Sequence, residues 1–150
     1  MPTRSSGFTL IELLVVVAVI GILSTIGLVQ YQGYVAGTKL KSAKNAMQQI
    51  LLAQTEELSN SGRYFISSSA GEGTCTANAA SSAEIETSLF SGGDVITSDA
   101  GFEMCIYADD DNAYRVKACK CEYDDVPECI KCIPGTVVIL THNGIYDPED

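Results

Sequence analysis

The sequence has no tryptophan and a single histidine, His142, among its 150 residues. One imidazole gives little material for histidine-based acid–base or nucleophilic chemistry. No combination of nucleophile, base and orienting group stands out elsewhere in the chain. We therefore expect a protein that is not an enzyme.

Basic residues are also scarce, with 9 Lys and Arg against 19 Asp and Glu, and the formal net charge is -10. Affinity of a whole surface for nucleic acid requires clustered basic side chains, so this balance argues against it. Lys39, Lys41 and Lys44 lie close together in the sequence. They leave a local DNA-binding patch as an alternative to a solvated helix face.

Charge is absent from Leu13 to Gly37, and no proline occurs between Pro2 and Pro127. About 20 apolar residues in a helix span a bilayer core. The run is therefore long enough for one transmembrane helix. Arg4 precedes it and Lys39 follows it, so the distribution of basic residues does not by itself orient the helix.

A carboxylate, Glu12, lies inside the start of this apolar stretch. An ionisable residue at the centre of a membrane helix costs about 2.5–3.5 kcal/mol on insertion scales, and such residues are usually functional. A secretory signal peptide would show a small-residue cleavage site after the apolar run, and none is clear here. A plain membrane anchor would explain the length of the run but not Glu12.

The residues MPTRSSG followed by FTLIE resemble the N-terminal signature of type IV prepilins, the precursors of pilins and pseudopilins. The resemblance implies that a prepilin peptidase cleaves between Gly7 and Phe8 and methylates the new amine of Phe8. It also implies that Glu12 meets the N-terminal amine of a neighbouring subunit and sets the axial register. Pairing of Glu12 with its own Phe8 amine stays open as an alternative.

The expected organisation is a leader peptide over 1–7, a transmembrane and filament-core helix over 8–37, an amphipathic helix over 38–58 and a globular head over 59–150. Apolar residues recur at helical spacing beyond the membrane run: Ala36, Leu40, Ala43, Met47, Ile50, Leu51 and Leu58. Pilins commonly carry a proline where this chain has Val29. A proline-centred melted stretch is therefore in doubt.

In the head, residues 101–108 and 113–121 predict a hairpin around a turn at 109–112, and residues 136–142 predict a third strand. A short helix is expected over 82–89. The resemblance implies an α+β pilin fold. In that fold the hydrophobic half of the long helix protrudes, and its amphipathic half packs on an antiparallel sheet of three or four strands.

All six cysteines follow the apolar run: Cys75, Cys105, Cys119, Cys121, Cys129 and Cys132. Such density in a small head favours disulfides and an oxidising compartment, which places the head outside the cytoplasm. We expect Cys119 and Cys121, on one strand face, to bridge to the segment with Cys129 and Cys132, and Cys75 to pair with Cys105. A four-thiolate zinc site is the alternative.

Acidic residues cluster at Asp109–Asp111 and at Glu122, Asp124 and Asp125. They raise the question of calcium, a ligand of some pseudopilins, because calcium binds several carboxylate oxygens. The spacing fits no calcium loop, so solvated turns are favoured. We expect no cofactor and no metal site, with calcium as the alternative.

The predicted function is that of a structural subunit of a type IV pilus, major or minor, serving adhesion, motility or DNA uptake. Its partners would be further copies of itself, prepilin peptidase, and an inner-membrane assembly platform with its ATPase. It would reside in the bacterial inner membrane with a periplasmic head before assembly, and in a surface pilus or periplasmic pseudopilus afterwards. The alternatives are a type II secretion pseudopilin and a membrane-anchored binding module that never polymerises.

Overall fold

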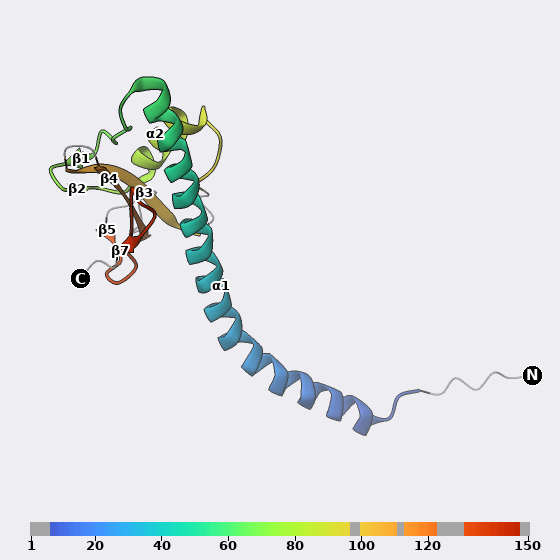
Figure 1. Ribbon diagram of the computed structural model, residues 1–150. Coiled ribbons are helices and arrows are strands. Elements are labelled where there is room, and N and C mark those ends of the chain that lie inside the picture. Colours follow the sequence, from blue (N-terminus) through green and yellow to red (C-terminus); the bar gives the residue numbers. More distant parts are fainter. Residues whose placement is uncertain (1–6, 97–99, 111–112, 123–130, 148–150) are drawn as a thin grey trace, which may run out of the picture. The chain divides into compact units, whose positions relative to one another are not determined.

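The computed structural model describes residues 7–96, 100–110, 113–122 and 131–147. The chain divides into two units, Met1–Thr38 and Lys39–Asp150. One helix, α1 (Leu10–Ser61), contributes to both of them (Figure 1). It begins two residues after Phe8 and ends three residues beyond Leu58, the limits expected from the sequence.

In the first unit, α1 is helical without interruption from Leu10 to Thr38. The backbone is therefore helical at residue 29, where a proline would remove a helix hydrogen bond. An apolar window of 18 residues, Leu10–Gly27, has a mean hydropathy of 2.6 and is long enough to cross a membrane. The hydroxyls of Ser24 and Thr25 donate to the carbonyls of Ile20 and Ile22, so neither needs water as an acceptor.

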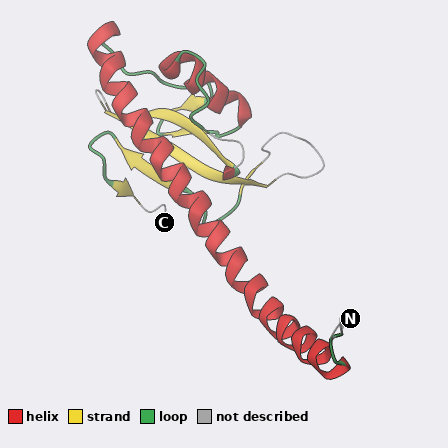
Figure 2. Cartoon of the chain, turned by 90° about the vertical axis from the view of Figure 1, so that its right-hand side faces the viewer, coloured by secondary structure: helices red, strands yellow, loops and turns green. Residues whose placement is uncertain are grey.

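In the second unit, the remaining turns of α1 lie across one face of an antiparallel sheet (Figure 2). The helix contributes Ala43, Ala46, Met47 and Ile50 to the core, each at most 4% exposed. The sheet contributes a larger apolar set: Phe102, Met104, Ile106, Tyr114, Val116, Ala118 and Leu140. Burial of these side chains is the main source of stability in this unit.

The sheet has five strands: β3 (Phe102–Asp110), β4 (Ala113–Glu122), β5 (Lys131–Cys132), β6 (Val138–Thr141) and β7 (Tyr146–Asp147). Strands β3, β4, β6 and β7 follow one another across the sheet, and β5 pairs with β4. The expected hairpin and third strand are present. The expected turn at 109–112 is shorter, because Asp109 and Asp110 belong to β3 and Asp110 pairs with Ala113.

Two small elements lie in the segment that we predicted as a loop with one short helix. Strands β1 (Ala70–Gly71) and β2 (Thr74–Cys75) form a two-stranded hairpin. Helix α2 (Ala79–Phe90) is longer than the predicted 82–89, because Asn78 and Ser81 form a reciprocal cap at its start. It ends at Ser91, whose φ of 52° is left-handed.

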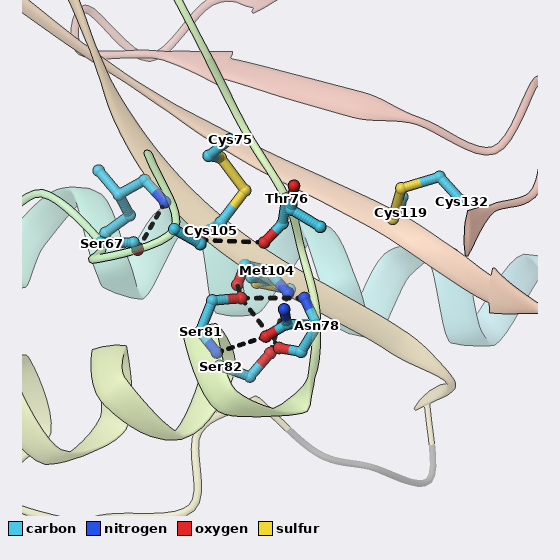
Figure 3. Close-up of a disulfide and its surroundings, with 12 residues drawn as sticks. Ser67, Cys75, Thr76, Asn78, Ser81, Ser82, Met104, Cys105, Cys119 and Cys132 are labelled. Atoms are coloured by element: carbon cyan, nitrogen blue, oxygen red, sulfur yellow. Dashed lines mark hydrogen bonds between the residues drawn. A yellow bond between two sulfur atoms is a disulfide. The ribbon is translucent and has the colours of Figure 1, made fainter. Parts of the chain in front are cut away.

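In the part of the chain that the structure describes, the outer edge of β3 is closed by contacts from three serines and not by another strand (Figure 3). The Ser81 hydroxyl donates to the Met104 carbonyl at 2.7 Å, and the Met104 N–H donates to Ser82 Oγ at 3.0 Å. Ser67 bonds the Ile106 carbonyl through its N–H and accepts from the Ile106 N–H at Oγ, both at 3.0 Å. An exposed strand edge can pair with another chain, and these contacts block that pairing.

A buried glutamine ties the end of α1 to the segment that follows it. Gln54 is 0% exposed, and its amide donates to the Phe65 carbonyl at 2.8 Å while accepting from the Phe65 N–H at 2.9 Å. Both backbone groups of Phe65 are thereby satisfied without a strand partner. The chain therefore returns to the sheet along a fixed path, with Tyr64 packed against Tyr114 at 4.6 Å between ring centroids.

Candidate functional site

The predicted processing position immediately precedes α1. Gly7 has nothing within 4 Å of the place where a Cβ would lie, and Phe8 is 91% exposed. Neither residue belongs to a helix or strand. The peptide bond between them is therefore free of secondary structure, as a protease substrate has to be.

Glu12 caps the start of α1. Its Oε2 accepts from the Thr9 N–H at 2.9 Å and from the Thr9 hydroxyl at 2.7 Å. In return the Glu12 N–H donates to Thr9 Oγ1 at 3.3 Å. This reciprocal pair is a capping box, and it places a carboxylate at the positive end of the helix dipole.

The capping role was missed in the sequence analysis, although the signal is present there. Thr9-Leu10-Ile11-Glu12 fits the pattern of Ser or Thr followed three residues later by Glu that marks a helix start. The box also explains why α1 begins at Leu10, because Thr9 occupies the capping position. The expected contact of Glu12 with an amine is not tested by the uncleaved chain, because the Phe8 nitrogen there is part of a peptide bond.

The apolar stretch that follows Glu12 is unburied by the rest of the chain. The large apolar side chains from Phe8 to Ile26 are between 50% exposed, at Val19, and 91% exposed, at Phe8. Contiguous apolar surface of this extent marks a membrane or protein contact. The first unit therefore presents a helix that requires lipid or other helices around it.

Disulfides hold the second unit together. Cys75 is joined to Cys105, which ties β2 to β3, and Cys119 is joined to Cys132, which ties β4 to β5 (Figure 3). The first pairing is the one expected from the sequence, and the second agrees with the expected bridge from β4. Cys121 is also disulfide-bonded.

The zinc alternative is not the arrangement found. Cys119 and Cys132 were two of its four ligands, and a disulfide leaves neither of them as a thiolate. Cys129 lies outside the described residues.

Arg115 neutralises one of the acidic residues considered for calcium. Its Nε lies 2.7 Å from Asp109 Oδ2, and its Nη1 lies 3.1 Å from Asp147 Oδ2. The hydrogen bond with Asp109 is the main reason that the pKa of Arg115 is raised. Asp109 therefore offers a calcium ion a carboxylate that is already paired.

The other acidic positions, Asp110, Asp111, Glu122, Asp124 and Asp125, have side chains outside the described part of the structure. Within the described ranges, no three His, Cys, Asp or Glu side chains are grouped as metal ligands. The expectation of no metal site, with calcium as the alternative, therefore stays a prediction.

The three lysines considered for DNA differ in their surroundings. Lys44 is half-buried, and its Nζ lies 4.8 Å from the centroid of the Tyr146 ring, whose hydroxyl donates to the Lys44 carbonyl. Lys39 is half-buried and Lys41 is exposed. A DNA patch made by all three would require Lys44 to leave the Tyr146 ring.

Comparison with known proteins supports the reading of the N-terminus. The prokaryotic N-terminal methylation motif matches residues 2–28. The chain is 41% identical over 61 residues to the type IV major pilin protein PilA of Myxococcus xanthus, which is 41% of this chain and 28% of that protein. It is 43% identical over 53 residues to the type IV major fimbrial protein FimA of Dichelobacter nodosus, which is 35% of this chain and 34% of that protein.

A fimbrial protein of Pseudomonas aeruginosa is 41% identical over 68 residues, covering 45% of this chain and 44% of that protein. The chain thus spans less than half the length of these three relatives. No solved structure matches it.

Proposed function

We propose that this chain is a structural subunit of a type IV pilus. It carries the prepilin-type methylation motif and is similar to type IV pilins over part of its length. The observation that carries the proposal is the Leu10–Gly27 helix segment, of which 0% is buried within the chain although its mean hydropathy is 2.6 and its one charged residue is Glu12. Such a helix can be surrounded by lipid before assembly and by the helices of other copies afterwards. The role is structural and not catalytic.

Processing would create the chemistry that the uncleaved chain lacks. Cleavage between Gly7 and Phe8 turns the Phe8 nitrogen into an amine, which methylation keeps basic. Glu12 now accepts hydrogen bonds from two uncharged donors of Thr9. The amine would be a charged donor, and an opposite charge close to a carboxylate stabilises its ionised form. We therefore expect Glu12 to exchange a Thr9 contact for the amine of a neighbouring subunit during assembly.

The partners and location follow from the same proposal. Prepilin peptidase would process the chain, and an inner-membrane platform with an ATPase would extract it from the membrane. The apolar helix fits an inner-membrane anchor, and the disulfides fit a periplasmic position of the second unit. Adhesion, motility and DNA uptake are functions that an assembled fibre could serve.

The test compares the wild-type chain with Glu12→Ala in the bacterium that encodes it. Sheared surface filaments and cell membranes are separated, and the chain is quantified in each fraction. We expect wild type in both fractions and Glu12→Ala, processed at the same bond, in the membrane alone. Glu72→Ala, which removes an exposed carboxylate from the β1–β2 turn, is the matched control and should behave as wild type.

The outcomes separate the parts of the proposal. Absence of the wild-type chain from all filaments would refute the function, and its confinement to a periplasmic filament would favour a secretion pseudopilus. If Glu12→Ala entered filaments as efficiently as wild type, the pairing of Glu12 with a neighbour would be wrong.

A further inference from the structure

The aromatic side chains of the first unit lie at the two ends of its helix. Phe8 precedes α1, and Tyr31 and Tyr34 lie close to the end of α1 within this unit. The 22 residues between Phe8 and Tyr31 include no aromatic residue. Tyr31 is 67% exposed and Tyr34 is 73% exposed. Because the two tyrosines are three residues apart, their rings project from neighbouring positions on one side of the helix.

The spacing between these tyrosines and Glu12 matches the thickness of a bilayer core. Tyr31 follows Glu12 by 19 residues and Tyr34 follows it by 22, and the backbone is helical throughout. At 1.5 Å per residue, these separations along the helix are about 29 and 33 Å. A hydrocarbon core is about 30 Å thick. When Glu12 lies at one membrane surface, the two rings therefore lie at the other.

The length of the uncharged run does not by itself fix this position. As a helix, the run Leu13–Gly37 measures about 37 Å, which exceeds the thickness of the core. A helix with such a run can tilt in the bilayer, and its position is set by residues that anchor it at the interface. Residues that favour the boundary between hydrocarbon and water are therefore needed to select one depth.

The hydroxyls of the two tyrosines have no hydrogen-bond partner among the described residues of the chain. A hydroxyl placed in hydrocarbon without a partner is unfavourable. At a membrane surface the ring contacts the acyl chains while the hydroxyl bonds with water or lipid oxygens, and tyrosine is enriched there. The unbonded hydroxyls therefore favour the membrane–water interface over the hydrocarbon and over a dry contact with a second helix.

We propose that Tyr31 and Tyr34 bind the headgroup and ester region of the bilayer leaflet opposite Glu12, and that they set the depth of the helix in the membrane. The inference rests on the proposed function, because it requires the helix to be stored in a membrane before assembly. The partner of the two rings in that state is phospholipid and not a second copy of the chain. The anchored rings also keep the Gly7–Phe8 bond at the other surface, where water and a peptidase reach it.

The absence of tryptophan from the chain allows a direct measurement of depth. Tyr31→Trp and Tyr34→Trp are made singly in the full-length chain, which is reconstituted in phosphatidylcholine vesicles. Ile22→Trp, about midway between Glu12 and Tyr31, is the matched control. Quenching of the single indole by lipids brominated beside the headgroup is compared with quenching by lipids brominated near the end of the acyl chain.

We expect bromine beside the headgroup to quench Tyr31→Trp and Tyr34→Trp at least about twofold more than deep bromine does, with the opposite order for Ile22→Trp. Because an indole itself favours the interface, a second arm removes both anchors. In the Ile22→Trp chain, Tyr31→Ala combined with Tyr34→Ala should change the ratio of the two quenching values by about twofold, since the depth is no longer fixed. Val35→Ala, which shortens an apolar side chain in the same stretch, should leave the ratio unchanged.

The inference is overturned if removal of both tyrosines leaves the ratio as it was. It is also overturned if deep bromine quenches Tyr31→Trp and Tyr34→Trp best, or if neither lipid quenches them, as for rings covered by protein. Ile22→Trp that neither lipid quenches would instead show that the helix is outside the bilayer. That result would refute membrane storage in the proposed function, and this inference with it.

Discussion

Replacement of Gln54 by leucine isolates the contribution of one buried hydrogen-bonding side chain. Gln54 is 0% exposed and makes two bonds with the Phe65 backbone, at 2.8 and 2.9 Å. Gln54→Leu keeps a similar volume but leaves the N–H and carbonyl of Phe65 without these partners. Each buried polar group left unsatisfied costs about 1–3 kcal/mol. Part of that cost is offset because leucine is easier to bury, so we expect a net loss of about 2–4 kcal/mol in the free energy of unfolding.

The assay is urea unfolding of the detergent-solubilised chain, followed by near-ultraviolet circular dichroism of its tyrosines. The chain has seven tyrosines and no tryptophan, and Tyr114 in the core reports on packing of the second unit. Gln49→Leu on the exposed side of the same helix is the matched control and should change the free energy of unfolding by less than about 0.5 kcal/mol. Equal effects of the two substitutions would refute the reasoning, because only Gln54 bonds Phe65.

Two further predictions concern the sheet. Ser82→Ala removes a donor to the buried Glu103 carboxylate and the acceptor of the Met104 N–H, so it should lower the free energy of unfolding by about 1–3 kcal/mol. The control, Ser88→Ala at an exposed position of the same helix, should lower it by less than about 0.5 kcal/mol. Equal losses for the two variants would contradict the role of Ser82. Burial, with a smaller contribution from Tyr64, raises the pKa of Tyr114 to about 12 from 10.0. Because the folded state then holds a proton that the unfolded state releases, Tyr114 contributes stability that is complete below pH 10 and is lost between pH 10 and 12. The free energy of unfolding, measured from pH 10 to pH 12, should fall less steeply with pH for Tyr114→Phe than for the wild type. Identical slopes would contradict the raised pKa of Tyr114.

The long elements of the fold could be predicted because their signals are local. Helix periodicity and apolar length place α1, and alternation places the hairpin of β3 and β4. Strands of two residues, such as β1 and β7, are too short to show a pattern. They exist because neighbouring segments hold them, and the sequence does not record that proximity.

Polar contacts between residues that are far apart in the chain could likewise not be predicted from the sequence. Gln54 occurs in an amphipathic helix as an ordinary polar residue, and only the folded chain places it against Phe65. Ser81 and Ser82 were part of a segment read chiefly as a loop, yet they close the edge of β3. Thr9 and Glu12 are different, because their capping box is a local pattern that the sequence shows. Glu12 was interpreted only by its charge, and its hydrogen bonds with Thr9 were therefore not predicted.

The central claim is that the chain becomes a fibre subunit after cleavage before Phe8. Mass spectrometry of intact protein from sheared, purified filaments tests it most directly. We expect a chain that begins at Phe8 and carries one methyl group on its amine. Filaments without the chain, or a chain in them that begins at any other residue, would contradict it.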